Sequence, residues 1–326
     1  MSSRIPPLTP PRRQSLWRAM PPVVFLPLLG LVALGLAWRR VLYSVQLPEA
    51  PAELILGAVS LLFLFALAVY AAKAIRRAGA VIEDLRTLPG RAGLASMTGG
   101  VMLLAAVAGP YSAALAAGFL WLGLALHAGQ AVLALRALAQ TGWRVDPVWH
   151  LSFAGLVLAA PGALALYLPV LALWLLGLSG AVALAIWGAS LRQIRRERVP
   201  APLRPLLAIH LVPACLFTMT AAGLGLGTLT LAFGALSAVI GLALLIEARW
   251  LTEAGYGPLW GAFTLPMAAA VSATVTLGWS GLGMPALVLS VVMLVAASST
   301  IPLIAVRVLQ AWARGDLARR TNASVA

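Results

Sequence analysis

Apolar residues run through this chain in long blocks separated by short clusters of charged positions. The uncharged stretches 19–38 and 54–72 can each hold one membrane-spanning helix of about 20 residues. Four further uncharged blocks, 92–135, 147–191, 205–246 and 254–306, are each long enough for two such helices. Turn-forming residues lie near the middle of each of these blocks, so the pattern predicts ten spans.

Composition supports a membrane protein. Hydrophobic residues make up 62% of the 326 positions, charged residues make up 10%, and the mean hydropathy is +0.97. A soluble domain of this length could not place so many apolar side chains away from water. The single cysteine, Cys215, excludes a disulfide framework and a CxxC metal or redox motif, and no cofactor is expected. The sequence therefore predicts an all-α polytopic membrane protein.

The basic residues orient the ten predicted spans. If the N-terminus is cytoplasmic, all of the 23 Lys and Arg except Arg39 and Arg40 fall on the cytoplasmic side. This predicts a multi-pass protein of a bacterial inner membrane with both termini in the cytoplasm. Residues 1–20 are interpreted as a disordered basic tail, 21–312 as the transmembrane domain and 313–326 as a second cytoplasmic tail. The basic loops suit anionic lipid headgroups and give no reason to expect a nucleic acid partner.

Helix-breaking residues recur along the chain. Pro161, Pro213 and Pro266 follow one another at intervals of about 50 residues, the length of a hairpin of two spanning helices. Pro27 in the first predicted span and Thr98-Gly99-Gly100 in the third lie at a comparable depth. All of them fall in odd-numbered spans. We therefore predict five helical hairpins, with an inner ring of odd helices around a central pore and an outer ring of even helices. The alternative is a compact bundle of ten helices without an axis.

Four motifs carry a family resemblance. They are the opening of the first span, with its proline, Gly-Leu and Ala-Trp38; Asp146-Pro-Val-Trp149 followed by Pro161-Gly162; Arg204-Pro205 running to Val212-Pro213-Ala214; and Trp260-Gly-Ala-Phe-Thr-Leu-Pro266. In this order they resemble the tellurite-resistance/dicarboxylate transporter family, which includes the slow anion channels of plant guard cells. The resemblance implies a homotrimer in which each protomer has its own pore for anions or dicarboxylates.

The resemblance also implies a phenylalanine that narrows the pore near the middle of the membrane. Family members carry this phenylalanine directly before the proline of the ninth helix, where this chain has Leu265. The constriction is therefore expected at Leu265, or at a displaced aromatic residue, Phe263 or Phe25. Pro27, Gly99, Pro161, Pro213 and Pro266 are expected to bend or line the pore. Weak contacts with Thr98, Ser152 and Thr264 are expected to select the anion.

No Asp, Glu, Lys or Arg lies inside a predicted span away from its ends. Coupled transporters usually place such groups there, so a passive anion channel or facilitator for chloride-like or nitrate-like anions or C4-dicarboxylates is favoured. The alternative is a secondary transporter that exports dicarboxylates or tellurite-type oxyanions. An enzyme is not expected, because HExxH, GxSxG and paired-acid motifs are absent from the sequence.

The histidines lie far apart in the sequence. His127 is interpreted as a buried core residue, with pH sensing as the alternative, and His150 as a residue of the membrane interface. His210 lies three positions before Pro213 and is a candidate for a pH-sensitive residue that faces the pore. The three are too dispersed in the sequence to predict a metal site.

Overall fold

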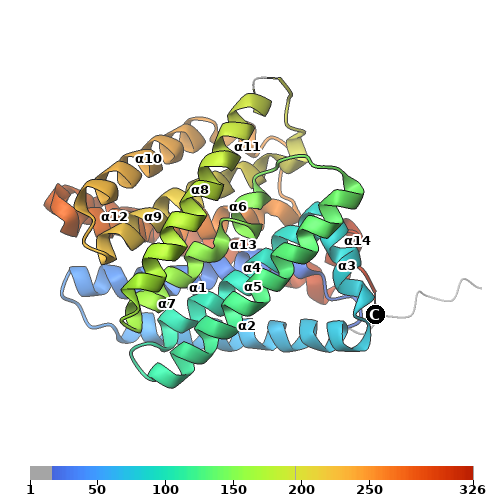
Figure 1. The fold of residues 1–326 in the computed structure, drawn as a ribbon, viewed down its shortest axis with the longest axis horizontal. Coiled ribbons are helices and arrows are strands. Elements are labelled where there is room, and N and C mark those ends of the chain that lie inside the picture. The colour runs from blue at the N-terminus through green and yellow to red at the C-terminus, as the bar shows by residue number, and fades with distance from the viewer. Residues whose placement is uncertain (1–16, 195, 326) are drawn as a thin grey trace, which may run out of the picture.

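The computed structural model describes residues 17–194 and 196–325, without the side chains of residues 141 and 194. Most of the predicted N-terminal tail therefore lies outside the described residues. The described part contains helices and no strand (Figure 1). The α-helices are α1 (Phe25–Ser44), α2 (Ala50–Arg76), α3 (Gly79–Arg86), α4 (Leu88–Ala108), α5 (Ala113–Thr141), α6 (Val148–Ser152), α7 (Ala160–Ala165), α8 (Pro169–Ile194), α9 (Leu211–Gly223), α10 (Gly227–Ile246), α11 (Ala248–Leu251), α12 (Thr264–Leu277), α13 (Gly283–Ala313) and α14 (Asp316–Arg320).

Short tight helices precede four of the α-helices. The 3₁₀ segments are η1 (Pro22–Val24) before α1, η2 (Gly155–Ala159) before α7, η3 (Ala201–His210) before α9 and η4 (Pro258–Phe263) before α12. A proline lies in the first turn of the α-helix after each of these junctions; these are Pro27, Pro161, Pro213 and Pro266. Backbone N–H groups of a first turn have no partner within the α-helix, so a proline there removes no hydrogen bond of that helix. The recurring prolines thus mark 3₁₀-to-α junctions, whereas the sequence suggested kinks inside continuous helices.

By length and composition, the described residues contain eight candidate membrane spans. The last candidate, Pro258–Ala313, has 56 residues and includes a break at η5 (Gly278–Leu282), where Gly281 has a φ of 119°. The predicted fifth span is divided into α6, η2 and α7, and none of these pieces is long enough to count as a span. A multi-pass helical membrane protein is thus confirmed, and the arrangement of ten spans in five hairpins stays a prediction.

The candidate spans differ strongly in burial. In the spans that contain α1, α4 and α9, 78% of the most apolar window is buried inside the protein. In those of α2, α5, α8 and α10, the buried share is 22%, 28%, 33% and 11%. The second group is apolar and exposed, as expected for helices that face lipid. High and low burial therefore alternate along the chain once the mostly buried segments α6, η2 and α7 are counted between α5 and α8.

The buried helices pack directly on one another. Helix α1 lies against α4, α12 and α13, and α12 also lies against α9. Gly30 of α1 allows a close approach to α12, because a Cβ atom there would lie 2.1 Å from Oγ1 of Thr264. The same Thr264 hydroxyl lies within hydrogen-bond distance of the Leu26 carbonyl oxygen, at 3.2 Å. Helices α1 and α12 are thus joined where both leave their 3₁₀ segments.

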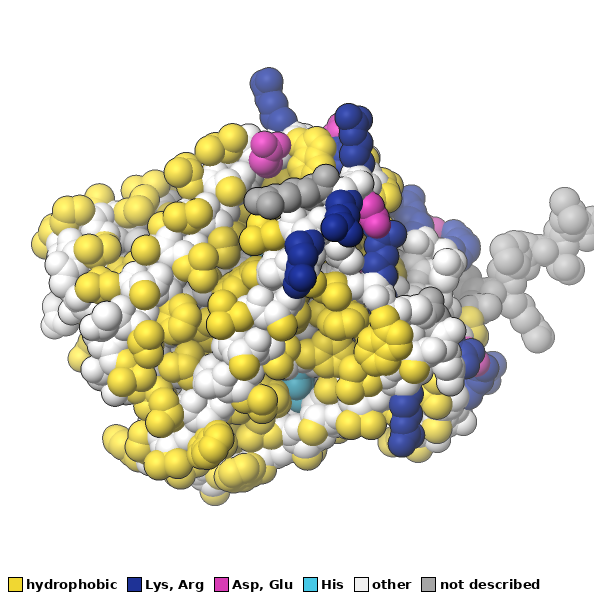
Figure 2. Space-filling model, turned by 45° about the horizontal axis from the view of Figure 1, so that its top comes forward, with side chains coloured by type: hydrophobic (Ala, Val, Ile, Leu, Met, Phe, Trp, Pro, Cys, Tyr) yellow, Lys and Arg dark blue, Asp and Glu magenta, His cyan; other side chains and the backbone are white. Residues whose placement is uncertain are grey.

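Basic residues gather at one end of the molecule (Figure 2). Ion pairs join loops that are distant in sequence there, among them Arg91 with Asp146 and Arg204 with Glu253. Arg39 lies near the other end of α1, where Nε bonds to Glu53 at 2.6 Å. The loops predicted to share a membrane side do lie together in the fold.

A buried ion pair also lies at the end of the molecule where the basic residues gather. Lys73 Nζ lies 2.9 Å from Asp84 Oδ2, and both side chains are fully buried. Lys73 also donates to the carbonyl oxygen of Met20, and Asp84 accepts from the backbone N–H of Ser324 at 2.8 Å. The pair thereby ties α2 and α3 to both ends of the described chain. Residues 313–325, predicted as a tail, include α14 and the buried Thr321 and Ser324.

Candidate functional site: a closed central constriction

A narrow void lies where the buried helices converge. Its lining comes from α1, α4, α6, the η3–α9 junction and the η4–α12 junction. The described lining residues are Leu26, Ser96, Leu151, Ile209, Val212, Gly261, Ala262, Leu265 and Pro266. The space between these residues is nowhere wide enough for a water molecule. Each of the five odd-numbered spans predicted from the sequence contributes to this lining. The void is therefore a narrow, apolar meeting point of the buried segments.

The η4–α12 junction supplies the largest share of this lining. Leu265 is 5% exposed and is the second residue of α12, and Pro266 is the third. The 3₁₀ turn before them ends at Phe263, which brings Gly261 and Ala262 to the same void. Gly261 packs on Pro27 of α1, since a Cβ there would lie 2.8 Å from the proline Cδ. The side chain of Leu265 and the tight approach of the two backbones thus border the void.

The two aromatic residues considered for a displaced gate lie elsewhere. Phe263 is half-buried and its ring packs edge-on against Trp260, with centroids 5.8 Å apart. Phe25 is fully buried, and its ring packs on Phe63 and Tyr70 of α2. Among the described residues, neither belongs to the lining of the void. The geometry thus brings Leu265, and not Phe263 or Phe25, to the convergence point.

Comparison with protein families matches this chain over residues 19–309 to the model of SLAC1, described as a voltage-dependent anion channel. The match spans nearly the whole chain and covers every segment that lines the void. The chain belongs to the SLAC1 family. The resemblance read from the four sequence motifs is thereby confirmed. Comparison with individual curated proteins gives no match.

Membership in the SLAC1 family indicates anion channel or transporter activity, a place in the lipid bilayer and small anions as substrates. Channels and transporters of this kind are not enzymes. Within the described residues, no group of three or more His, Cys, Asp or Glu is placed to hold a metal ion.

Hydroxyl groups near the constriction differ in their hydrogen bonds. Thr264 Oγ1 lies 2.7 Å from the Gly261 carbonyl oxygen, and Thr98 Oγ1 lies 2.8 Å from His127 Nδ1. These two hydroxyls have partners within the protein. Ser96 and Ser152 are fully buried, and their hydroxyls have no partner within the described part of the chain. Of the two, Ser96 lines the void, so it is the free hydroxyl at the constriction of this SLAC1-family chain.

Ser96 has no distinguishing signal in the sequence, because it lies in a run of small residues in α4. Thr98 and Gly99, two and three positions further on, were the predicted lining residues of that helix. Gly99 instead packs against Leu158 of η2, where a Cβ would lie 2.6 Å from the leucine Cδ1. A helix turns by about 100° per residue, so Thr98, two positions from Ser96, lies on another face. Gly99, three positions from Ser96, lies on the same side of α4 but meets Leu158 there.

Two of the three histidines lie in contact. His150 Nε2 lies 2.9 Å from His210 Nδ1, and the rings meet edge to face with centroids 4.9 Å apart. His150 is 1% exposed and therefore buried within the fold, and its expected position at the membrane interface stays a prediction. His127 is buried and bonded to Thr98, as expected for a core residue. The contact joins α6 to η3, whose neighbouring residues Leu151 and Ile209 line the void.

Proposed function

We propose that this protein is a passive anion channel or facilitator whose permeation path crosses the central void and is closed there by Leu265. The observation that carries the proposal is the convergence of the buried segments on one apolar constriction that does not admit water. A hydrophobic constriction of this kind gates ions by excluding water, because an ion cannot enter without part of its hydration shell.

The alternation of burial along the chain supports the proposed arrangement of ten spans. Counting α6, η2 and α7 as one broken span, and dividing Pro258–Ala313 at η5, gives ten crossings. In this count the mostly buried helices are odd-numbered and the mostly exposed ones are even-numbered. An inner ring of odd helices within an outer ring of even helices accounts for both the burial and the repeated 3₁₀-to-α junctions.

The composition of the lining favours passive movement over coupled transport. The described lining consists of aliphatic side chains, glycine, proline and the hydroxyl of Ser96. Ion-coupled or proton-coupled carriers place ionisable groups at such a depth. We further propose that Ser96 donates a hydrogen bond to the passing anion and replaces part of its lost hydration. In this respect Ser96 takes the role that the sequence assigned to Thr98, Ser152 and Thr264.

The orientation follows from the basic residues. The arginine-rich end is proposed to face the cytoplasm of a bacterial cell, with the protein in the inner membrane and both termini on that side. There it attracts anions towards the path. The homotrimer with one pore per protomer, and the choice between chloride-like or nitrate-like anions and C4-dicarboxylates, are proposed from the family resemblance.

The test is electrical. The purified protein is placed in a planar bilayer with gradients of chloride, nitrate or malate salts. Currents whose reversal potential follows the anion gradient are expected for a channel. Silence under every gradient, together with saturable counterflow of labelled dicarboxylate or tellurite-type oxyanion in liposomes, would establish the alternative, a secondary transporter.

A further inference from the structure

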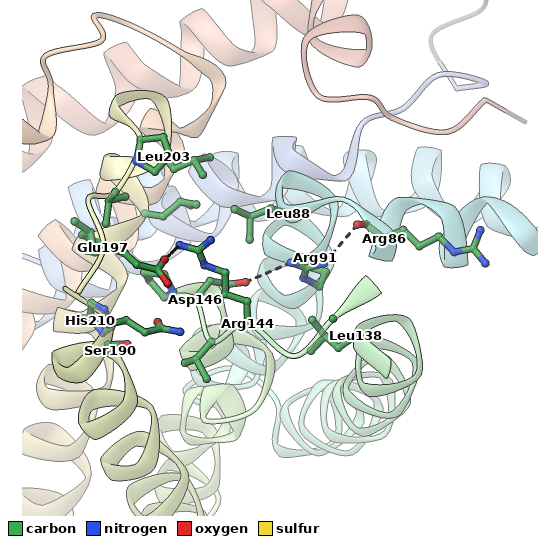
Figure 3. A pocket seen from close by; sticks show the side chains of 18 residues that line it. Arg86, Leu88, Arg91, Leu138, Arg144, Asp146, Ser190, Glu197, Leu203 and His210 are labelled. Carbon is green, nitrogen blue, oxygen red and sulfur yellow. Dashed lines mark hydrogen bonds and ion pairs between the residues drawn. The ribbon is translucent and has the colours of Figure 1, made fainter. Parts of the chain in front are cut away.

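A second and wider cavity lies at the arginine-rich end of the fold. Its volume is about 410 Å³, and it is surrounded by α3, α4, the ends of α5 and α8, the loop after α5 and η3 (Figure 3). It shares α4 and η3 with the central void, but within the described chain no lining residue is common to the two, so we treat it as a separate cavity. We call it the arginine pocket.

The arginine pocket lies between two exposed helices. Leu138 of α5 and Ser190 of α8 line it. Helix α5 packs mainly on α4, whereas α8 packs on α7, α9 and η2. Trp143, next to the pocket residue Arg144, is 60% exposed. Exposed tryptophans of membrane proteins concentrate at the level of the lipid headgroups. The arginine pocket is thus placed between lipid-facing helices at the depth of the headgroups.

Three arginines with different surroundings supply the positive charge of the pocket. Arg91 is 9% exposed, and its Nη2 lies 3.3 Å from Asp146 Oδ2. The Nε of Arg91 is buried and lacks a hydrogen-bond partner within the described residues. A buried donor without an acceptor is costly, so an arriving acceptor that reorients this guanidinium would satisfy it. Arg91 is therefore the deep positive group of the arginine pocket.

The other two arginines lie at the rim and are free to turn. Arg144 pairs with Glu197, but the two side chains are 70% and 54% exposed, and exposed pairs contribute little. Arg86 is exposed and donates to Gln140 Oε1 at 3.1 Å. Figure 3 shows Arg144 and Arg91 on the two sides of Asp146. These rim groups can therefore exchange their present partners for a ligand.

Aliphatic side chains make up much of the remaining wall of the pocket. These are Leu88, Leu138, Leu203, Leu206 and Leu207. A wall that combines guanidinium groups with leucines suits a ligand that carries both an anionic group and apolar carbon atoms. Guanidinium forks match the oxygen atoms of phosphate, and basic pockets between transmembrane helices bind phospholipid headgroups.

We propose that the arginine pocket binds a phosphate group through Arg86, Arg91 and Arg144, presented by the headgroup of an anionic phospholipid. Free phosphate shares the same chemistry but leaves the leucines without a partner. This site is separate from the permeation path, and its occupancy does not depend on whether the protein is a channel or a carrier.

The experiment measures lipid binding, not current. The full-length protein is purified in detergent, and phosphatidylglycerol and phosphatidylcholine are titrated separately while native mass spectrometry counts bound lipids. The pocket variant is Arg86→Gln with Arg144→Gln. Its matched control is Arg136→Gln with Arg249→Gln, which removes two exposed arginines outside the described lining. A parallel arm titrates inorganic phosphate against the bound lipid.

The expected result is a preference of the wild type for phosphatidylglycerol. The pocket variant should lose about fivefold in affinity for each arginine removed, as expected for basic residues at an anionic membrane surface. The control variant should keep the wild-type affinity. Glu197→Gln should strengthen binding, because it releases Arg144 from its present partner.

Two outcomes would overturn the proposal. One is an equal loss of affinity for phosphatidylglycerol in the pocket variant and the control, which would mean that the lipid is attracted diffusely to the basic end of the protein. The other is wild-type binding of phosphatidylglycerol no tighter than that of phosphatidylcholine, with no effect of inorganic phosphate. Displacement of the lipid by millimolar phosphate, sensitive to the same two arginines, would support the phosphate site and assign it to a soluble source.

Discussion

Replacement of Leu265 by alanine tests the proposed constriction directly. Leu265 is 5% exposed and lines a void that does not admit a water molecule. The substitution deletes three carbon atoms, which frees space on the order of two water molecules at about 30 Å³ each. Water and a partly hydrated anion could then enter. We expect the anion current to rise about tenfold or more, because each 1.4 kcal/mol removed from a barrier is a factor of ten in rate.

The same substitution should reduce stability. Truncation of a buried leucine costs about 2–5 kcal/mol, and the lower end is expected here because a void already adjoins the side chain. The matched control is Leu277→Ala on the same helix, where the leucine packs against Gly234 of α10 and, among the described residues, lies outside the lining. It should lower the melting temperature without raising the current.

The assay is single-channel recording in planar bilayers, with thermal unfolding in detergent measured on the same preparations. A Leu265→Ala current equal to that of the wild type, in protein that remains folded, would refute the placement of the gate. A comparable rise in Leu277→Ala would refute it as well, since the effect would then follow from loosened packing. Phe263→Ala should leave the current nearly unchanged, because Phe263 packs on Trp260.

Three further predictions concern single groups. Ser96→Ala should reduce chloride permeability by about two- to tenfold relative to nitrate, since one net hydrogen bond is worth about 0.5–1.5 kcal/mol and chloride sheds water less readily. The control is Thr264→Val, because the Thr264 hydroxyl already bonds to a carbonyl group. It should leave the chloride-to-nitrate permeability ratio, measured from reversal potentials, unchanged. Asp84→Asn should lower the free energy of unfolding by about 3–5 kcal/mol, because it leaves Lys73 charged and buried. Replacing both residues by apolar ones should lower it less, and equal losses of stability in thermal unfolding would contradict this account. Burial raises the pKa of Asp146 despite the nearby Arg91. The lipid affinity of the arginine pocket should therefore increase as the pH falls through that raised pKa, because the carboxylate loses its charge. Titrations of phosphatidylglycerol at several pH values should show this dependence in the wild type and not in Asp146→Asn.

Asp146 also makes the stability of the fold depend on pH. Its pKa in the folded protein lies above the ordinary value of 3.8, so its contribution to stability is complete below that value and is lost as the pH rises through the raised pKa. The other charged or titratable groups of the pocket are Arg86, Arg91, Arg144, Glu197 and His210. A pH profile that survives in Asp146→Asn would assign the titration to one of these groups.

Several features of the site could be predicted from the sequence because they are local. The prolines of the odd-numbered spans were found from their spacing, and the structure places each at a 3₁₀-to-α junction. Leu265 was found by aligning one short motif on Pro266. These signals depend on neighbouring residues, whose types dictate the backbone near them.

Other features depend on contacts between distant positions. His150 and His210 lie 60 residues apart in the sequence, yet the fold brings their ring nitrogens to 2.9 Å. The pairing of Arg91 with Asp146 and the docking of Ser324 on Asp84 are of the same kind. A single sequence contains no periodic signal for such pairs, because they depend on how helices are placed against one another.

The sequence by itself determined that this chain is a multi-pass membrane protein of an anion channel family, and its prolines located the 3₁₀-to-α junctions. Hydropathy, proline and charge act within about one helix length, so their consequences can be derived from the chain in order. Only the tertiary structure decided that Leu265 and Ser96 meet at a closed void and that Arg91 faces a separate pocket. Those arrangements follow from the packing of helix faces, and a shift of one or two positions turns a side chain from the lining into the core.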